Sequence, residues 1–117
     1  MAQLQLGLIG TGMLGGAIAR QLLASGYVAP DGLLLANRSA SAKGFADWPG
    51  IRVVADMQAL AEACDTILLA MPPAAASGFS IEAGNRLVIS VMAGVSLAQL
   101  SAMTGSPHVV RAMSSPA

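Results

Sequence analysis

The 117-residue sequence predicts a single α/β domain built on a parallel β-sheet. Short apolar runs alternate along the chain with segments that have helical spacing. The apolar runs are continuous and do not alternate with polar residues, which is typical of strands that helices bury on both faces. The length fits one domain, since most domains have about 100–150 residues. These observations predict a doubly wound sheet.

Strands and helices are expected to alternate from the first residues to the last. Six strands are predicted, at residues 4–10, 32–36, 51–54, 66–71, 86–92 and 108–113. Three helices are predicted, at residues 14–25, 57–63 and 96–103. Asp56 and Ser96 are suitable N-caps, and Gly26 is a suitable stop for the first helix. Residues 74–78 are expected to form a loop or the start of a helix.

The composition excludes several classes of protein. Apolar residues make up 55% of the chain and charged residues 10%, which is the reverse of a disordered composition. Six basic and six acidic residues cancel, and no basic stripe suggests a nucleic-acid or anionic membrane surface. The charge-free stretches are too short, or too often interrupted by glycine, proline and polar residues, to be membrane spans. The single cysteine, Cys64, excludes an internal disulfide; we expect it to be a small buried hydrophobe in a cytoplasmic protein.

Three glycines stand at the junction of the first strand and the first helix. Gly10, Gly12 and Gly15 give the spacing G-x-G-x-x-G. In a Rossmann-type dinucleotide-binding fold the first glycine permits the tight turn, the second admits a pyrophosphate, and the third lets helix and strand pack closely. The helix N-terminus then offers unpaired N–H groups to the phosphates. The alternative is a glycine-rich turn that only connects two packed elements.

The end of the second strand carries a cation where a carboxylate is expected. A carboxylate at this place binds a ribose 2′-hydroxyl and repels a 2′-phosphate. The chain instead has Asn37, Arg38 and Ser39, with Lys43 close behind. A planar guanidinium and small donors suit a phosphate, and such a contact contributes about 1.5–3 kcal/mol. The sequence therefore predicts NADP as the cofactor, the alternative being that Arg38 is a solvated loop residue.

Five segments together resemble the N-terminal domain of pyrroline-5-carboxylate reductase, the last enzyme of proline biosynthesis. They have the family's order and spacing, at residues 7–18, 36–39, 67–73, 90–100 and 109–117. The resemblance covers essentially the whole chain and implies NADPH-dependent reduction of a cyclic imine, 1-pyrroline-5-carboxylate, to proline. It also implies that residues 1–117 are a cofactor domain without the family's C-terminal helical domain, which dimerises and supplies much of the substrate pocket. We then expect a homo-oligomer where that domain is present, and an isolated chain that binds NADP but has little or no activity.

The same resemblance assigns the cofactor-binding residues. The pyrophosphate is assigned to Gly10, Thr11, Gly12, Met13, Leu14 and Gly15. The adenosine phosphate is assigned to Asn37, Arg38 and Ser39. The loop after the fourth strand, with Ala70, Met71 and Pro72, is expected along the cofactor, and Ala93 and Gly94 are expected near the nicotinamide.

The chain departs from the family pattern in four places. Met13-Leu14 replaces the family's Asn-Met, Pro72 replaces a Lys, and Met57 replaces an Asn that reaches the cofactor. The final Met113–Ala117 segment is one residue shorter than its family counterpart. Two alternatives therefore stay open. One is a non-catalytic NADP-binding module, and the other is a related NADP-dependent oxidoreductase with a different substrate, such as one that pairs NADP with a deazaflavin.

No catalytic residue can be assigned from the sequence. His108, the only histidine, opens a predicted buried strand, where a structural or edge position is favoured over a role as general acid. No His, Cys, Asp or Glu cluster has metal-ligand spacing, and no metal site is predicted. Ser114 and Ser115 are equally suited to bind a ligand or to begin a linker. In hydride transfer the nicotinamide performs the redox chemistry, so the protein mainly has to position it.

Overall fold

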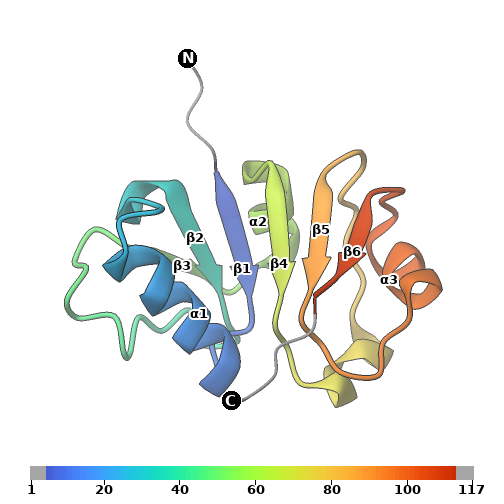
Figure 1. Cartoon of the computed structure of the whole chain (residues 1–117), viewed down its shortest axis with the longest axis horizontal. Coiled ribbons are helices and arrows are strands. Elements are labelled where there is room, and N and C mark those ends of the chain that lie inside the picture. The colour runs from blue at the N-terminus through green and yellow to red at the C-terminus, as the bar shows by residue number, and fades with distance from the viewer. Residues whose placement is uncertain (1–4, 113–117) are drawn as a thin grey trace.

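In the computed structural model, which describes residues 5–112, six parallel strands form one sheet between two layers of helices (Figure 1). The strands are β1 (Leu6–Ile9), β2 (Leu33–Ala36), β3 (Arg52–Val54), β4 (Thr66–Leu69), β5 (Leu87–Ser90) and β6 (Val109–Arg111). Their order in the sheet is β3-β2-β1-β4-β5-β6, and every neighbouring pair is parallel. This order confirms the predicted doubly wound, Rossmann-type fold.

The predicted helices and their caps are present. The helices are α1 (Met13–Ala24), α2 (Met57–Ala63) and α3 (Leu97–Thr104), with 3-10 segments η1 (Pro30–Gly32) and η2 (Pro73–Gly78). The Asp56 carboxylate accepts hydrogen bonds from the first turn of α2, and Ser96 forms a reciprocal capping box with Gln99 at the start of α3. Residues 74–78, predicted as a loop or helix start, lie in η2.

Several strands are shorter than the apolar runs that predicted them. The runs at residues 66–71 and 86–92 extend past β4 and β5, which end at Leu69 and Ser90. Met71 and Met92 continue the runs because they are buried, with 7% and 5% of their surface exposed. Their side chains pack in the core after the backbone has left the sheet, so the apolar pattern could not mark the strand ends.

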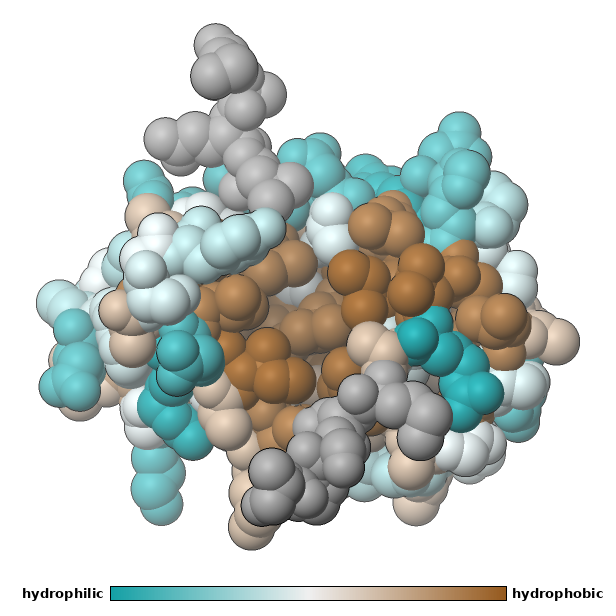
Figure 2. All heavy atoms as spheres, viewed as in Figure 1, coloured by the Kyte–Doolittle hydropathy of each residue, from teal (hydrophilic) through white to brown (hydrophobic). Residues whose placement is uncertain are grey.

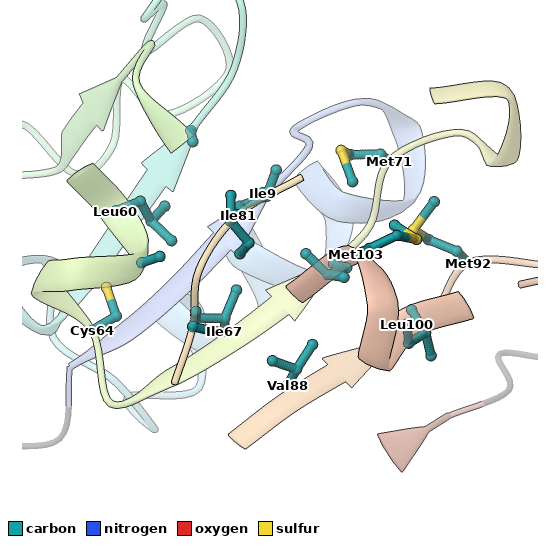
Figure 3. Close-up of a cluster of buried hydrophobic side chains, with 14 of the residues drawn as sticks. Ile9, Leu60, Cys64, Ile67, Met71, Ile81, Val88, Met92, Leu100 and Met103 are labelled. Carbon is teal, nitrogen blue, oxygen red and sulfur yellow. The ribbon is translucent and has the colours of Figure 1, made fainter. Parts of the chain in front are cut away.

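One face of the sheet is covered by α2, α3 and the connection between β4 and β5. Figure 3 shows the side chains that fill this layer. Leu60 on α2 and Leu100 on α3 are fully buried against Ile67 of β4 and Val88 of β5. Cys64 is 2% exposed in the same cluster, which confirms the prediction that it is a small buried hydrophobe.

The other face is covered only over half of its width. Helix α1 and residues 37–51 pack on β1, β2 and β3 through Ala19, Leu23 and Phe45. Leu8 on β1, Leu68 on β4 and Val110 on β6 lie in one row of paired residues across the sheet. Their exposed fractions are 0%, 8% and 46%, so this face becomes more exposed toward β6. Figure 2 shows this apolar surface beside α1.

The prediction that all strands are buried on both faces is therefore wrong for the outer strands. Arg52 on β3 is exposed at one edge, and Val110 at the other; His108, which precedes β6, is exposed too. The cause is the handedness of the connections. From β3 onward the chain crosses the sheet in one direction, and right-handed crossovers in that direction all lie on the face that carries α2 and α3.

Candidate cofactor-binding site

A cavity of about 1000 Å³ opens at the carboxyl edge of the central strands. It lies where β1 has β2 on one side and β4 on the other, which is the point at which the strand order reverses. Ligands of doubly wound sheets bind at such a point. Most of the predicted cofactor residues line this cavity: Gly10, Thr11, Gly12, Asn37, Arg38, Ser39, Met71 and Pro72.

The glycine turn combines two glycines that the fold requires with one that it does not. Gly10 has φ +99°, a backbone conformation that favours glycine, and its N–H donates to the Ala36 carbonyl at 3.0 Å. A Cβ on Gly15 would overlap the Gly10 carbonyl oxygen and lie 3.0 Å from the Ala70 Cβ. A Cβ on Gly12 would meet no heavy atom within 4 Å. Packing therefore does not explain Gly12, whereas a ligand that approaches the backbone from the cavity does.

Helix α1 begins at this turn without a side-chain cap. Gly12 is the N-cap, and the first helical hydrogen bond runs from the Gly16 N–H to the Gly12 carbonyl at 2.8 Å. The preceding N–H groups, of Met13, Leu14 and Gly15, therefore have no partner within the helix. The Met13 side chain is 92% exposed, and neither Met13 nor Leu14 lines the cavity. What these two residues offer an anion is their backbone N–H groups and the positive end of the helix dipole.

The end of the cavity beside β2 is cationic. Arg38 and Ser39 are exposed on the loop after β2, and Ser41 and Lys43 from the same loop also line the cavity. None of the described residues in the cavity wall carries a carboxylate. Two cations beside two hydroxyl groups, with no competing anion, are suited to bind a phosphate monoester.

The opposite wall is apolar and comes from a segment that the sequence analysis did not assign. Ala74, Ala75 and Phe79, in and just after η2, line the cavity together with Met57 at the start of α2. These side chains suit the flat face of an aromatic ring. Residues 73–78 are small apart from the proline, and the sequence offered no signal beyond a break between two strands.

The remaining predicted residues lie outside this cavity. Gly15 is buried beneath the turn, and Ala70, the first residue after β4, packs next to it. Gly94 lines a separate cleft of about 350 Å³ between η2 and α3, and Ala93 precedes it on the same loop. Ser77 lines both hollows, so the cleft and the cavity lie on two sides of η2. The roles predicted for these residues stay predictions.

The described residues supply no metal cluster at this site. Within residues 5–112 no three His, Cys, Asp or Glu side chains gather closely enough to hold a metal ion. His108 lines neither hollow. Burial raises the pKa of the Cys64 thiol, which keeps it protonated, and it too lies away from both. Ser114, Ser115 and the rest of the Met113–Ala117 segment lie outside the described residues. No helix in the described part of the chain could span a bilayer.

Residues 5–94 match a family model described as NADP oxidoreductase, coenzyme F420-dependent. The chain belongs to this family. The matched range contains the glycine turn, the cationic loop after β2 and the loop with Ala93 and Gly94. The predicted cofactor, NADP, is confirmed, since it is the dinucleotide of this oxidoreductase family. No curated protein matches the sequence.

Solved structures with the same fold include two pyrroline-5-carboxylate reductases. The Plasmodium falciparum enzyme with NADP bound is 24% identical, with a TM-score of 0.75 over 97% of this chain and 43% of the enzyme. The Coxiella burnetii enzyme is 25% identical, with a TM-score of 0.73 over 96% of this chain and 44% of the enzyme. An imine reductase from Aspergillus terreus, in complex with NADPH4, is 18% identical, with a TM-score of 0.71 over 99% of this chain and 43% of the enzyme. The resemblance to the reductase family is thus confirmed, and the chain spans less than half the length of these proteins.

Proposed function

We propose that this chain is the cofactor domain of an NADPH-dependent reductase that acts on a C=N bond, with 1-pyrroline-5-carboxylate as the first substrate to test. The observation that carries the proposal is the stretch of residues 37–43 after β2, which places Arg38 and Lys43 beside the glycine turn in a cavity wall without a carboxylate. The similarity to the Coxiella burnetii pyrroline-5-carboxylate reductase supports the substrate class. A reaction of this kind would belong to proline biosynthesis.

The residues of the cavity have distinct tasks under this proposal. The backbone at Gly12 and the N-terminus of α1 bind the pyrophosphate. Arg38, Ser39 and Lys43 bind the 2′-phosphate, and the η2 wall excludes water from one face of the adenine. When bound, NADPH supplies the hydride. The chain's own residues hold the dinucleotide, and we assign none of them as the proton donor.

The substrate pocket is proposed to come from outside these residues. The relatives with solved structures are more than twice as long as the segment they share with this chain. The uncovered apolar half of the sheet, with Leu87 and Val110 exposed, is consistent with a surface that a further domain or a second subunit covers. We accordingly propose a two-domain, homo-oligomeric reductase in which residues 1–117 bind the cofactor.

A second candidate function is favoured by the family's description. That description names coenzyme F420, a deazaflavin, so the hydride could pass between NADP and a deazaflavin instead of an imine. The cavity residues would hold NADP in the same way in both cases. The two candidates differ only in the molecule that meets the nicotinamide.

The first test is a calorimetric titration of the chain with NADPH and, in parallel, with NADH. We expect NADPH to bind at least tenfold more tightly, because a charge-assisted contact to the 2′-phosphate contributes about 1.5–3 kcal/mol. Arg38→Ala should remove this preference. The matched control is Arg52→Ala, since Arg52 is an exposed cation on β3 whose side chain bonds Gln5 and the Asp31 carbonyl and does not line the cavity. An equal affinity for both dinucleotides, unchanged in Arg38→Ala, would refute the proposal.

The second test assigns the substrate and uses the full-length protein that contains this domain. NADPH oxidation is followed at a fixed cofactor concentration with 1-pyrroline-5-carboxylate, with other cyclic imines or with an oxidised deazaflavin. Turnover of the imine supports the first candidate, and turnover of the deazaflavin alone supports the second. NADPH binding without turnover of either would contradict both and indicate a non-catalytic NADP-binding module.

A further inference from the structure

Asn37 stands where two parts of the cavity meet. It is the first residue after β2, and its backbone N–H donates to the Val54 carbonyl of β3 at 3.1 Å. Its carbonyl accepts a hydrogen bond from the Ala40 N–H at 3.2 Å, which closes a tight turn. Arg38 and Ser39 are the two central residues of this turn. Asn37 therefore begins the loop that presents the cation to the cavity.

The Asn37 side chain is bonded within the protein on all sides. Its Nδ2 donates to the Thr11 hydroxyl oxygen at 2.9 Å and to the Ser41 carbonyl at 2.9 Å. Its Oδ1 accepts from the Ser41 N–H at 2.9 Å and from the Ser39 hydroxyl at 3.5 Å. An amide has two N–H donors, and both donors of Asn37 are engaged at 2.9 Å. Although Asn37 lines the cavity, its amide therefore has no N–H left to donate to a phosphate.

We propose that Asn37 is a positioning residue that couples the two phosphate sites of the cavity, and not a direct ligand of the 2′-phosphate. The inference rests on the proposed binding of NADP. One amide joins Thr11, which lies between the glycines of the pyrophosphate turn, to Ser41, which closes the loop that holds the 2′-phosphate. The amide thereby fixes the position of the glycine turn relative to the loop after β2.

The effect on the pyrophosphate site follows from the direction of the bond to Thr11. Because the Thr11 oxygen accepts from Asn37 Nδ2, the hydroxyl hydrogen of Thr11 is left to donate in another direction. Thr11 lines the cavity, so its hydroxyl hydrogen is available to donate to an anion bound there. Asn37 in this way makes Thr11 a donor toward an anion.

The effect on the 2′-phosphate site follows from the shape of the loop. Ala40 has φ +51°, a left-handed conformation that is unfavourable for alanine by roughly 1 kcal/mol. The two bonds between the Asn37 amide and the Ser41 backbone span this residue and hold the conformation. Arg38 and Ser39 are thus placed before a ligand arrives, which reduces the entropy lost on binding.

The test compares three variants by the affinity of the chain for NADPH and for NADH. Thr11→Val, which keeps the shape and removes the hydroxyl, should weaken both dinucleotides by the same factor, from a few-fold to about tenfold. Arg38→Ala should weaken NADPH alone. Asn37→Ala should weaken NADH as much as Thr11→Val does, and NADPH by more. In the Asn37→Ala/Thr11→Val double variant, the NADH affinity should fall no further than in Asn37→Ala.

Each alternative role of Asn37 gives a different pattern. A direct ligand of the 2′-phosphate would lose NADPH affinity alone in Asn37→Ala, and a purely structural residue would lower Tm with both affinities unchanged; either result overturns the proposal. If Asn37→Ala does not fold, Thr11→Val and Thr11→Ser test the proposal instead. Thr11→Ser should keep the wild-type affinities for NADPH and NADH. A Thr11→Val variant that loses affinity for one dinucleotide more than for the other would refute the coupling. A wild-type chain that binds neither dinucleotide refutes the proposed function itself.

Discussion

One added methyl group at each of two glycines should separate what the fold needs from what the cofactor needs. A Cβ at Gly12, a residue that lines the cavity, would meet no heavy atom within 4 Å. A Cβ at Gly15 would overlap the Gly10 carbonyl oxygen and lie 2.9 Å from the Gly10 carbonyl carbon. We therefore expect Gly12→Ala to impair binding and Gly15→Ala to impair folding.

The magnitudes follow from these contacts. At Gly15 the neighbour is backbone and cannot rotate away, so overpacking of about 3 kcal/mol outweighs the ~1 kcal/mol that alanine gains over glycine in a helix. The net loss of about 2 kcal/mol would lower Tm by roughly 8 °C in a domain of this size. At Gly12, alanine is a poorer N-cap by about 0.5–1 kcal/mol, and the less flexible unfolded chain offsets this by about 0.4–1 kcal/mol. Tm should then change by less than ~3 °C. Loss of one charge-assisted hydrogen bond to a phosphate, about 1.5–3 kcal/mol, predicts an NADPH affinity about 10- to 150-fold weaker.

Thermal unfolding followed by circular dichroism and titration with NADPH measure the two effects separately. The expected result is a folded Gly12→Ala that has lost affinity, beside a Gly15→Ala whose Tm is clearly lower. Wild-type affinity in Gly12→Ala would refute the argument that this glycine is there for the pyrophosphate. An equal loss of Tm in both variants would show that the open space at Gly12 is needed by the fold.

Three further predictions concern stability and association. Ser96→Ala removes the capping box, in which the Ser96 hydroxyl accepts a hydrogen bond from the Gln99 N–H at 3.1 Å. This substitution should lower the free energy of unfolding, measured by urea titration, by about 1 kcal/mol. An unchanged urea midpoint would contradict this prediction. Burial raises the pKa of the Cys64 thiol above its ordinary value. The stability that the thiol contributes is therefore complete below its pKa in the unfolded chain and is lost as the pH rises through its pKa in the folded chain. The stability advantage over Cys64→Ala should therefore shrink above about pH 9, and a pH-independent difference would be the contrary result. The isolated chain should self-associate with concentration through its uncovered sheet face, and Val110→Lys should reduce this; a constant mass in light scattering of the wild type would argue against it.

The features that local sequence could predict are those whose cause is local. A cap needs only the side chain and the next turn of backbone, so Asp56 and Ser96 could be identified from their position before a helix. The glycine spacing is similarly local, because Gly10 and Gly15 contact each other across one turn. The doubly wound class followed from the continuous apolar runs that alternate with helices, whereas the strand order is given by the structure.

The features that sequence could not predict depend on contacts between distant segments. The apolar wall of the cavity is formed by η2, whose residues pack against α2 and the strands only once the sheet exists. The bond from Asn37 to Thr11 joins residues 26 positions apart, so the sequence showed a polar residue near a phosphate site without showing that its amide is already engaged. The exposure of Val110 likewise depends on which face each crossover takes.

The departures from the reductase pattern fit a site that depends mainly on backbone and on the loop after β2. Met13 stands where the family has a polar side chain, yet its side chain points to solvent and its position contributes a backbone N–H that any residue provides. Met57 replaces another polar residue and joins the apolar wall. Under the proposed function, a site without these two polar side chains draws more of its affinity from the cations and hydroxyls at Arg38, Ser39 and Lys43. We therefore expect such a site to discriminate more strongly between NADPH and NADH, because these groups are suited to a 2′-phosphate.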